Sequence, residues 1–373
     1  MEKDLVRRAK RLKSYHQETI LKKTRSHVQL QDLPGDLLST ILSKLPLKDA
    51  VRTGVLSSKW KDAWKVCPKL KFDGGMVCGG QQCTQKFIDI VNAVMKQHQT
   101  PINFLGHANQ YRFPFELLDD ESISRLQHIQ LSYTSFELPT QFSGFINLTT
   151  LDLHLIRVTK KVLQDMLSNC INLEWLSMVR CHLNDELKVA RPLSNLLYLR
   201  VAHCKITKIE LNAMKLRTFV FRGMLHPIDL GQAPELKDTS LHFFCSATLQ
   251  HAFTALATLL PSVQNLTFRA NVSLEFNTVL AFTHRGLGPV KRLPRCPHSY
   301  LKNVHITGYV GSIGEIEPLV YIVENAAALE QLTIKTEDEL GDQGKRILSF
   351  HIHELETRWL HGLISPNTKL CIV

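Results

Sequence analysis

Long apolar runs and disulfide-forming cysteines are both scarce in this sequence. No segment approaches the roughly 20 consecutive apolar residues that a membrane-spanning helix needs, and the first residues lack the apolar core of a secretory signal. The nine cysteines are an odd number and far too few for a disulfide scaffold in a chain of 373 residues. We therefore expect reduced thiols, no membrane partner, and a globular protein of two or three domains in the nucleus, the cytoplasm or both.

Motifs for catalysis and for cofactor binding are also lacking. Cys78 and Cys83 have no second cysteine pair nearby, so they do not supply the four ligands of a zinc site. His351 and His353 complete no hydrolytic motif, and the glycine-rich stretch 311–315 lacks the lysine and hydroxyl of a phosphate-binding loop. No Gly-x-Ser-x-Gly nucleophile elbow occurs. We expect a protein that is not an enzyme and that holds no metal and no cofactor.

Positive charge is in excess, but it is concentrated near the start of the chain. The formal net charge is +11, and residues 1–30 alone hold nine Lys or Arg against three Asp or Glu. Two basic clusters, at 7–13 and 22–25, suit either a solvated tail or a bipartite nuclear import signal. Neither cluster contains an aromatic residue that could stack on a base, so nucleic acid is not expected as a partner.

Residues 30–72 carry the start and stop signals of three short helices. Pro34 suits the first turn of a helix, and leucine and isoleucine residues follow it at helical spacing. The Leu-Pro pair at 45–46 ends that helix and begins a second, and a serine can cap a third helix that carries Trp60 and Trp64 on one face. A bundle of about 40 residues is marginal alone and gains stability from a partner's apolar surface.

The run LPGDLLSTILSKLPLKDAVRTGVLSSKWKDAW at 33–64 resembles the F-box of plant F-box proteins, in its LPxxLLxxILSxLP opening and its RTxxLSxxW close. The resemblance implies a helical module that binds the Skp-type adaptor, and through it the cullin, of a cullin-RING ubiquitin ligase. It also implies that the rest of the chain recognises a protein substrate. An alternative is that the apolar positions form only the internal core of the bundle, in particular at Leu38, Val55 and Trp64.

The adaptor-binding residues that this resemblance implies are mostly apolar and fall on all three expected helices. They are Leu33, Pro34, Leu37, Leu38, Ile41, Leu42, Leu45, Pro46, Val51, Leu56 and Trp60.

From residue 126 onward, segments of the form Lxx(L/I/V)x(L/I/V/F/M) recur. Most steps between them are 20–28 residues, within the range of leucine-rich repeats, and one step is 38 residues. Such repeats stack their strands in parallel along one face of a solenoid. The segments begin at Leu126, Leu148, Leu173, Leu196, Leu216, Leu236, Val263, Leu301 and Leu329.

Single positions within these segments have expected roles. Cys181, Cys204 and Asn271 occupy the ninth position, where the side chain faces inward and satisfies backbone groups of the loops. The stretch 158–170 has the apolar spacing of a helix, whereas the two 20-residue steps suit extended connections. Residues between the leucines point out of the sheet, where they contact a substrate or are simply solvated. These are Gln130, Asp152, Ser177, Arg200, Val220, Arg222 and Thr267.

Residues 300–334 resemble the FBD-like segment of plant F-box/LRR-repeat proteins. They are expected to form a strand, a glycine-containing loop, a helix and a second strand, and to close the solenoid. Two stretches depart from the family pattern, namely 96–113 and the 38-residue step between Val263 and Leu301. One interpretation is that both are loops. Relative to the family pattern we interpret them as missing repeat material, which would leave strand edges exposed.

The expected architecture is α/β, with a small N-terminal three-helix F-box followed by a leucine-rich-repeat solenoid of parallel strands. The expected domains are a basic tail (1–29), the F-box (30–72), a linker with an irregular start of repeats (73–125), leucine-rich repeats (126–299), and the FBD-like terminal repeat with a C-terminal cap (300–373). The resemblance implies a substrate-recognition subunit of an SCF-type ligase. The alternative is a repeat scaffold or degenerate paralogue that assembles no ligase.

Overall fold

A computed structural model describes residues 33–42, 44–45, 69–73, 111–115, 118, 120–140, 142–224, 226–244, 261–270, 295–309, 313–336, 360 and 362–373. The chain divides into two compact units, 1–67 and 68–373. No helix within the described ranges is long and apolar enough to cross a membrane.

The first unit contains helix α2, Gly35–Leu42. The amide of Leu38 donates to the carbonyl of Pro34 at 3.1 Å, so the proline lies at the start of the first turn, where it needs no amide hydrogen. This helix falls where the sequence predicts the first of three. The second and third expected helices lie outside the described residues.

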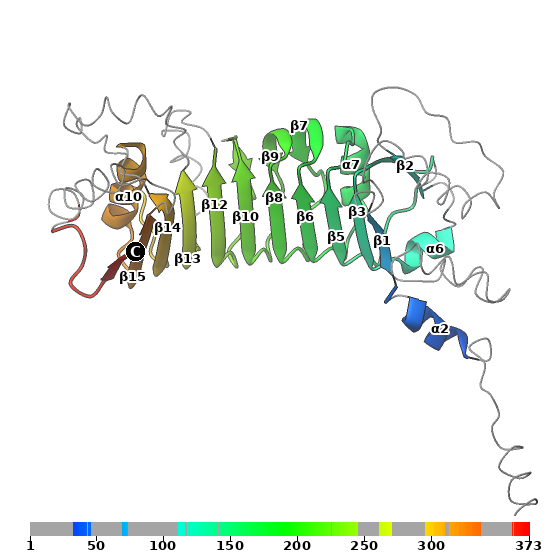
Figure 1. Cartoon of the computed structure of the whole chain (residues 1–373), viewed down its shortest axis with the longest axis horizontal. Helices are drawn as coiled ribbons and strands as arrows, with labels where there is room; N and C mark the ends of the chain where they lie inside the picture. The colour runs from blue at the N-terminus through cyan, green and yellow to red at the C-terminus, as the bar shows by residue number, and fades with distance from the viewer. Residues whose placement is uncertain are drawn as a thin grey trace, which may run out of the picture. The chain divides into compact units, whose positions relative to one another are not determined.

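The second unit is built on a sheet of eleven strands, all paired in parallel (Figure 1). The predicted parallel-strand solenoid is therefore observed. In spatial order the strands are β1 (Lys69–Asp73), β3 (His128–Ser132), β5 (Thr150–His154), β6 (Trp175–Val179), β8 (Tyr198–Ala202), β10 (Thr218–Gly223), β12 (Asp238–Phe243), β13 (Asn265–Ala270), β14 (Asn303–Tyr309), β15 (Gln331–Thr336) and β16 (Lys369–Ile372).

Alternation of side chains within each strand builds the core. The leucines of the repeat segments, such as Leu151, Leu176 and Leu199, are in register on one side of the sheet, and each is fully buried. A second buried row runs beside them through Leu153, Met178 and neighbouring strands. Each such side chain contributes about 1.5–3 kcal/mol on burial, so stacking of repeats supplies most of the stabilisation.

A second layer covers the apolar side of the sheet, and its composition follows the length of each repeat. Strands β7 (His182–Lys188), β9 (Lys205–Glu210) and β11 (Ile228–Asp229) form a small parallel sheet in the short repeats. The extended connections predicted for the 20-residue steps are thus confirmed. Strands β2 (Tyr111–Pro114) and β4 (Thr134–Glu137) form a further pair, and helix α6 spans Asp120–Arg125.

Helices occur where a repeat is long enough to hold one. Helix α7 (Lys160–Ser168) begins at Thr159, whose hydroxyl accepts a hydrogen bond from the amide of Val162, and it buries Leu163, Met166 and Leu167. Helix α10 (Ile313–Asn325) lies between β14 and β15. The strand-helix-strand order predicted within residues 300–334 is therefore confirmed, and the expected loop between β14 and α10 lies outside the described residues.

Polar contacts anchor α10 to the segment that precedes β14. The backbone of His298 donates to the carbonyl of Asn325 at 2.8 Å, and the Asn325 side chain accepts from the amide of Cys296 at 2.8 Å. The His298 imidazole is fully buried and lies 3.2 Å from the Tyr321 hydroxyl. Burial lowers the pKa of His298. The histidine therefore serves as a neutral core residue.

The residue after each of four successive strands of the sheet has the same left-handed backbone conformation. Tyr133, Leu155, Arg180 and His203 directly follow β3, β5, β6 and β8, and each has φ of 54–55°. The amide of each still donates to the neighbouring strand, as between Arg180 and the carbonyl of Ala202 at 2.8 Å. The left-handed conformation costs non-glycine residues about 1–2 kcal/mol, which these hydrogen bonds help to offset.

The sheet begins at β1, which lies at the end of the stretch assigned to the F-box and pairs with β3. The sheet also corrects two expectations. β13 pairs directly with β14 across the 38-residue step, and β1 with β3 across 96–113, so neither stretch leaves the expected open edge. The FBD-like segment does not close the sheet, because β16 pairs beyond β15.

Candidate functional site

The side of the eleven-stranded sheet opposite the core, here called the polar face, is the candidate interaction surface. Its central row runs in register through Gln130, Asp152, Ser177, Arg200, Val220, Ser240 and Thr267. Six of the seven residues predicted to point outward lie in this row, and Arg222 lies in the next row. Ser177 is buried, with 5% exposure, so it is available to a partner only in part.

Three arginines from successive repeats extend from the central row to the ends of these strands. Arg200 lies in β8, Arg222 lies in β10 beside Ala202, and Arg180 follows β6. We call Arg180, Arg200 and Arg222 the arginine cluster. Val179 and the fully buried Ala202, which are in register with Arg222, carry short side chains. Strands in a sheet are about 4.8 Å apart, so the outer two positions are separated by roughly 10 Å.

The arginine cluster generates a positive local field. Burial lowers the pKa of His203, and the charges of Arg180, Arg222 and Arg200 lower it further. The His203 ring stacks on Phe244 with centroids 4.8 Å apart. The side chain thus lies within the cluster as a neutral imidazole at neutral pH.

An aromatic pair lies at the opposite end of the same strands. Trp175 of β6 and Tyr198 of β8 are in register, with ring centroids 3.5 Å apart and planes at 8°. Trp175 remains 41% exposed. The sequence analysis missed this pair, although the first strand position of two successive repeats is aromatic, which is a readable signal for a cross-strand contact.

Asparagines that precede the leucine segments join neighbouring repeats. The side-chain amides of Asn147, Asn172 and Asn195 donate to the carbonyls of Ser124, Ile146 and Ile171 at 2.7, 2.8 and 3.1 Å. The sequence analysis missed these bonds too. Their signal is the Asn-Leu dipeptide that recurs at the start of three segments.

The cysteines at the ninth position have the structural role expected of them. The Cys181 thiol donates to the carbonyl of Leu153 at 3.3 Å, and the Cys204 thiol lies 3.4 Å from the carbonyl of Met178. Contact with Cys204, together with burial, raises the pKa of Cys181. Asn271 lies outside the described residues.

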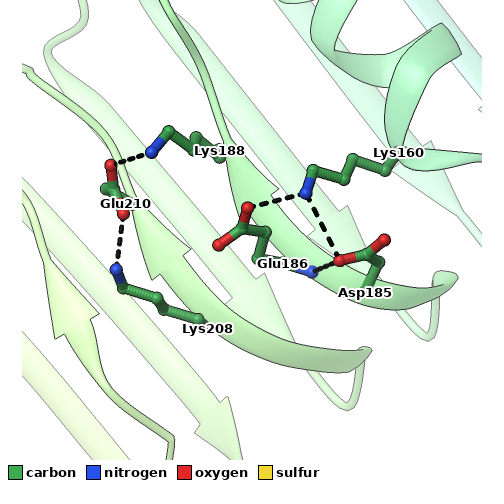
Figure 2. Close-up of polar contacts among 6 residues, drawn as sticks. All are labelled: Lys160, Asp185, Glu186, Lys188, Lys208 and Glu210. Carbon is green, nitrogen blue, oxygen red and sulfur yellow. Dashed lines mark hydrogen bonds and ion pairs between the residues drawn. The ribbon is translucent and has the colours of Figure 1, made fainter.

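Ion pairs occupy the second layer, away from the polar face (Figure 2). Glu210 of β9 lies between Lys188 and Lys208, 2.5 Å from each ammonium group. Lys160 of α7 contacts Glu186 at 2.6 Å and Asp185 at 3.6 Å. Because these basic groups already have carboxylate partners, the second layer offers an acidic ligand less than the arginine cluster does.

Candidate small-ligand sites are few in the part of the chain that the structure describes. Within those residues no group of three or more His, Cys, Asp or Glu is placed to hold a metal ion. A cavity of about 670 Å³ lies beside the starts of β12 and β13, and it is lined by apolar residues such as Leu230 and Pro234 and by polar residues such as Lys237. Cys78, Cys83, His351 and His353 lie outside the described residues.

The predicted adaptor-binding residues divide between two sides of α2 where they are described. Leu37, Ile41 and Leu45 are 48%, 38% and 37% exposed, and Pro34 is also exposed. Leu38 and Leu42 are buried, at 3% and 1% exposure, and Leu33 is half-buried. Pro46, Val51, Leu56 and Trp60 lie outside the described residues.

The fold and the register of its strands define a leucine-rich-repeat protein, and comparison with protein families agrees. A family model described as "At1g61320/AtMIF1, LRR domain" matches residues 93–284, more than half of the chain. An FBD model matches 289–334, and an F-box domain model matches 30–72. The chain belongs to the plant F-box/LRR family whose members carry an FBD segment.

Three similar proteins of Arabidopsis thaliana illustrate the range of similarity. The chain is 28% identical to the F-box/FBD/LRR-repeat protein At1g13570 over 46% of this chain and 48% of that protein. It is 25% identical to the putative FBD-associated F-box protein At1g61330 over 69% of this chain and 64% of that protein. It is 56% identical to the F-box/LRR-repeat protein At3g26922 over 12% and 15%. The chain thus spans less than two thirds of each relative's length.

Proposed function

We propose that this protein is the substrate-recognition subunit of an SCF-type cullin-RING ubiquitin ligase. Its F-box binds a Skp-type adaptor, and through it the cullin, while the polar face of the repeat sheet binds a target protein. The observation that carries the proposal is the F-box match at 30–72 on a chain whose other unit is a repeat sheet. The protein supplies no chemistry of its own, since a receptor contributes by holding its target near the reacting groups.

The exposed apolar side of α2 supports the adaptor contact. Pro34, Leu37 and Ile41 recur at helical spacing and remain open to solvent, and Leu45 follows at the end of the helix. Apolar side chains on an otherwise small bundle favour association with an apolar partner surface. Leu38 and Leu42 are buried, so their contribution is to the core of the F-box unit.

The proposal extends to the organisation of the chain and to its location. We assign residues 1–29 to a basic tail, 30–72 to the F-box and the following residues to target recognition. We place the protein in the nucleus, the cytoplasm or both, where an SCF-type ligase acts.

The test is co-purification of the full chain with a plant Skp-type adaptor and a cullin. We expect the chain to recover both, and we expect Leu37→Asp and Ile41→Asp to lose them, because a carboxylate on the exposed side of α2 opposes apolar contact. Thr40→Asp is the matched control, since Thr40 is an exposed polar residue on the same helix.

Recovery of the adaptor by Leu37→Asp and Ile41→Asp as by the intact chain would contradict the contact surface. Failure of the intact chain to recover the adaptor would contradict the ligase role. The protein would then be a leucine-rich-repeat scaffold that assembles no ligase, and the polar face would remain its binding surface.

A further inference from the structure

On the polar face, basic residues greatly outnumber carboxylates towards the ends of the strands. The area considered runs from β5 to β13 and comprises the described residues of the central row, of the row beyond it and directly after the strands. It contains one carboxylate, Asp152. The same area contains four arginines and three histidines. These are Arg180, Arg200, Arg222, Arg269, His154, His203 and His242.

The arginine cluster has no acidic partner within the described residues. Arg217 and Lys302, which lie at the starts of β10 and β14, pair with Glu235 at 3.2 Å and with Glu330 at 2.7 Å. Arg180, Arg200 and Arg222 have no such ion pair in that part of the chain, and Asp152 is two strands away from Arg200. The guanidinium groups are therefore available to a ligand, and Arg180 and Arg222 are exposed.

Guanidinium groups bind carboxylates with two parallel hydrogen bonds, which gives both affinity and orientation. An extended peptide places alternate side chains on one side about 6–7 Å apart, so two or three acidic residues span the roughly 10 Å between the outer arginines.

We propose that the arginine cluster binds a short acidic segment of a protein, rich in Asp and Glu. This proposal deepens the proposed function, because it names the chemistry of the target. It rests on the proposed function in one respect, namely that the bound protein is a target for ubiquitination. A nucleic acid fits less well. A long polyanion that crosses the sheet meets Asp152 in the central row and Asp238 at the opposite end of the strands, both on the same face.

The experiment measures binding of a fluorescein-labelled ten-residue peptide of Glu and Gly to the full chain by fluorescence anisotropy. A peptide with Gln in place of Glu is the uncharged control. We expect Arg180→Gln, Arg200→Gln and Arg222→Gln each to weaken binding by about tenfold, and the triple variant to abolish it. Circular dichroism and the melting temperature establish that each variant folds.

A matched triple variant removes the same charge elsewhere. Lys188→Gln, Arg217→Gln and Lys302→Gln act on groups that already have carboxylate partners, so the peptide should bind as to the intact chain. Equal weakening by both triple variants would overturn the proposal, because it would show attraction by net charge, including that of the basic N-terminal residues. Tighter binding of a labelled ten-nucleotide oligouridylate, lost in the same arginine variants, would also overturn it and indicate RNA.

Adaptor co-purification separates this inference from the proposed function. The arginine triple variant should still recover the Skp-type adaptor. Peptide binding by a chain that recovers no adaptor would leave the acidic-segment site standing and contradict the ligase role. Adaptor recovery without peptide binding would support the ligase role and contradict the acidic-segment site.

Discussion

Trp175 lies flat against Tyr198 across two parallel strands, with ring centroids 3.5 Å apart and planes at 8°. The two residues are in direct register at the start of β6 and β8, so the contact depends on the spacing of the strands and on the alignment of successive repeats. Because the pair is on the polar face, it stabilises the sheet outside the apolar core.

The aromatic contact should be measurable as a coupling energy. Trp175→Ala and Tyr198→Ala each remove the stacking, so in a double-mutant cycle the two changes should be less than additive by about 1 kcal/mol. Chemical unfolding followed by circular dichroism gives the free energies. Strict additivity would show that the rings contribute only through their separate contacts with the sheet.

Asn172 should contribute to the joint between neighbouring repeats. Asn172→Ala removes the hydrogen bond to the carbonyl of Ile146, and we expect a loss of about 1 kcal/mol in the free energy of unfolding. Asn172→Asp keeps the size but cannot donate, so it should cost at least as much. An Asp variant as stable as the parent would show that the side chain does not act as a donor.

Gly144 should tolerate no side chain. Its φ is +107°, and a Cβ would lie 2.5 Å from the Cβ of Asn169 and 2.8 Å from the carbonyl oxygen of the same residue. We expect Gly144→Ala to cost about 2–3 kcal/mol, through backbone strain and steric overlap. Gly362→Ala is the matched control.

Gly362 also has a positive φ, of +79°, but no atom lies within 4 Å of the position of its Cβ. Its change to Ala should therefore cost only the backbone strain, about 1 kcal/mol. Thermal unfolding of the two variants tests the comparison. Equal melting temperatures would contradict a close approach between Gly144 and Asn169.

Acid should destabilise the fold through His298. Burial holds the pKa of this histidine below its ordinary value of 6.5, so the unfolded chain takes up a proton that the folded chain resists. The stabilisation is complete above pH 6.5 and is lost as the pH falls below that value. The free energy of unfolding between pH 7.5 and 5 measures the effect.

His298→Gln provides the control for this pH dependence. Glutamine keeps a polar group near the Tyr321 hydroxyl but does not titrate, so the decline below pH 6.5 should become shallower. An unchanged pH profile in this variant would assign the acid sensitivity to other histidines.

The sequence predicted much of this architecture because each leucine-rich repeat packs mainly against the repeats next to it in the sequence. The recurrence of the leucine segments predicted the parallel sheet, and the lengths of the steps predicted that α7 forms in a long repeat and that β9 and β11 replace helices in short ones. Cys181 and Cys204 were assigned to backbone contacts by their position in the repeat.

The errors lie where pairing is not local. β1 is separated from β3 by more than 50 residues, and no repeat pattern marks it, so its place in the sheet was missed. The 38-residue step was interpreted as missing material because spacing alone does not show that the strands on either side of a long step pair directly. β16 escaped notice for the same reason.

The sequence by itself determined the period of the repeats, the alternation that buries their leucines, and the F-box pattern at 30–72. Only the tertiary structure decided which polar residues meet. Along the chain 20 residues separate Arg180 from Arg200 and 22 separate Arg200 from Arg222, and the parallel register brings them to neighbouring strands about 4.8 Å apart. Proximity across repeats depends on that register, which is set by packing of the whole core.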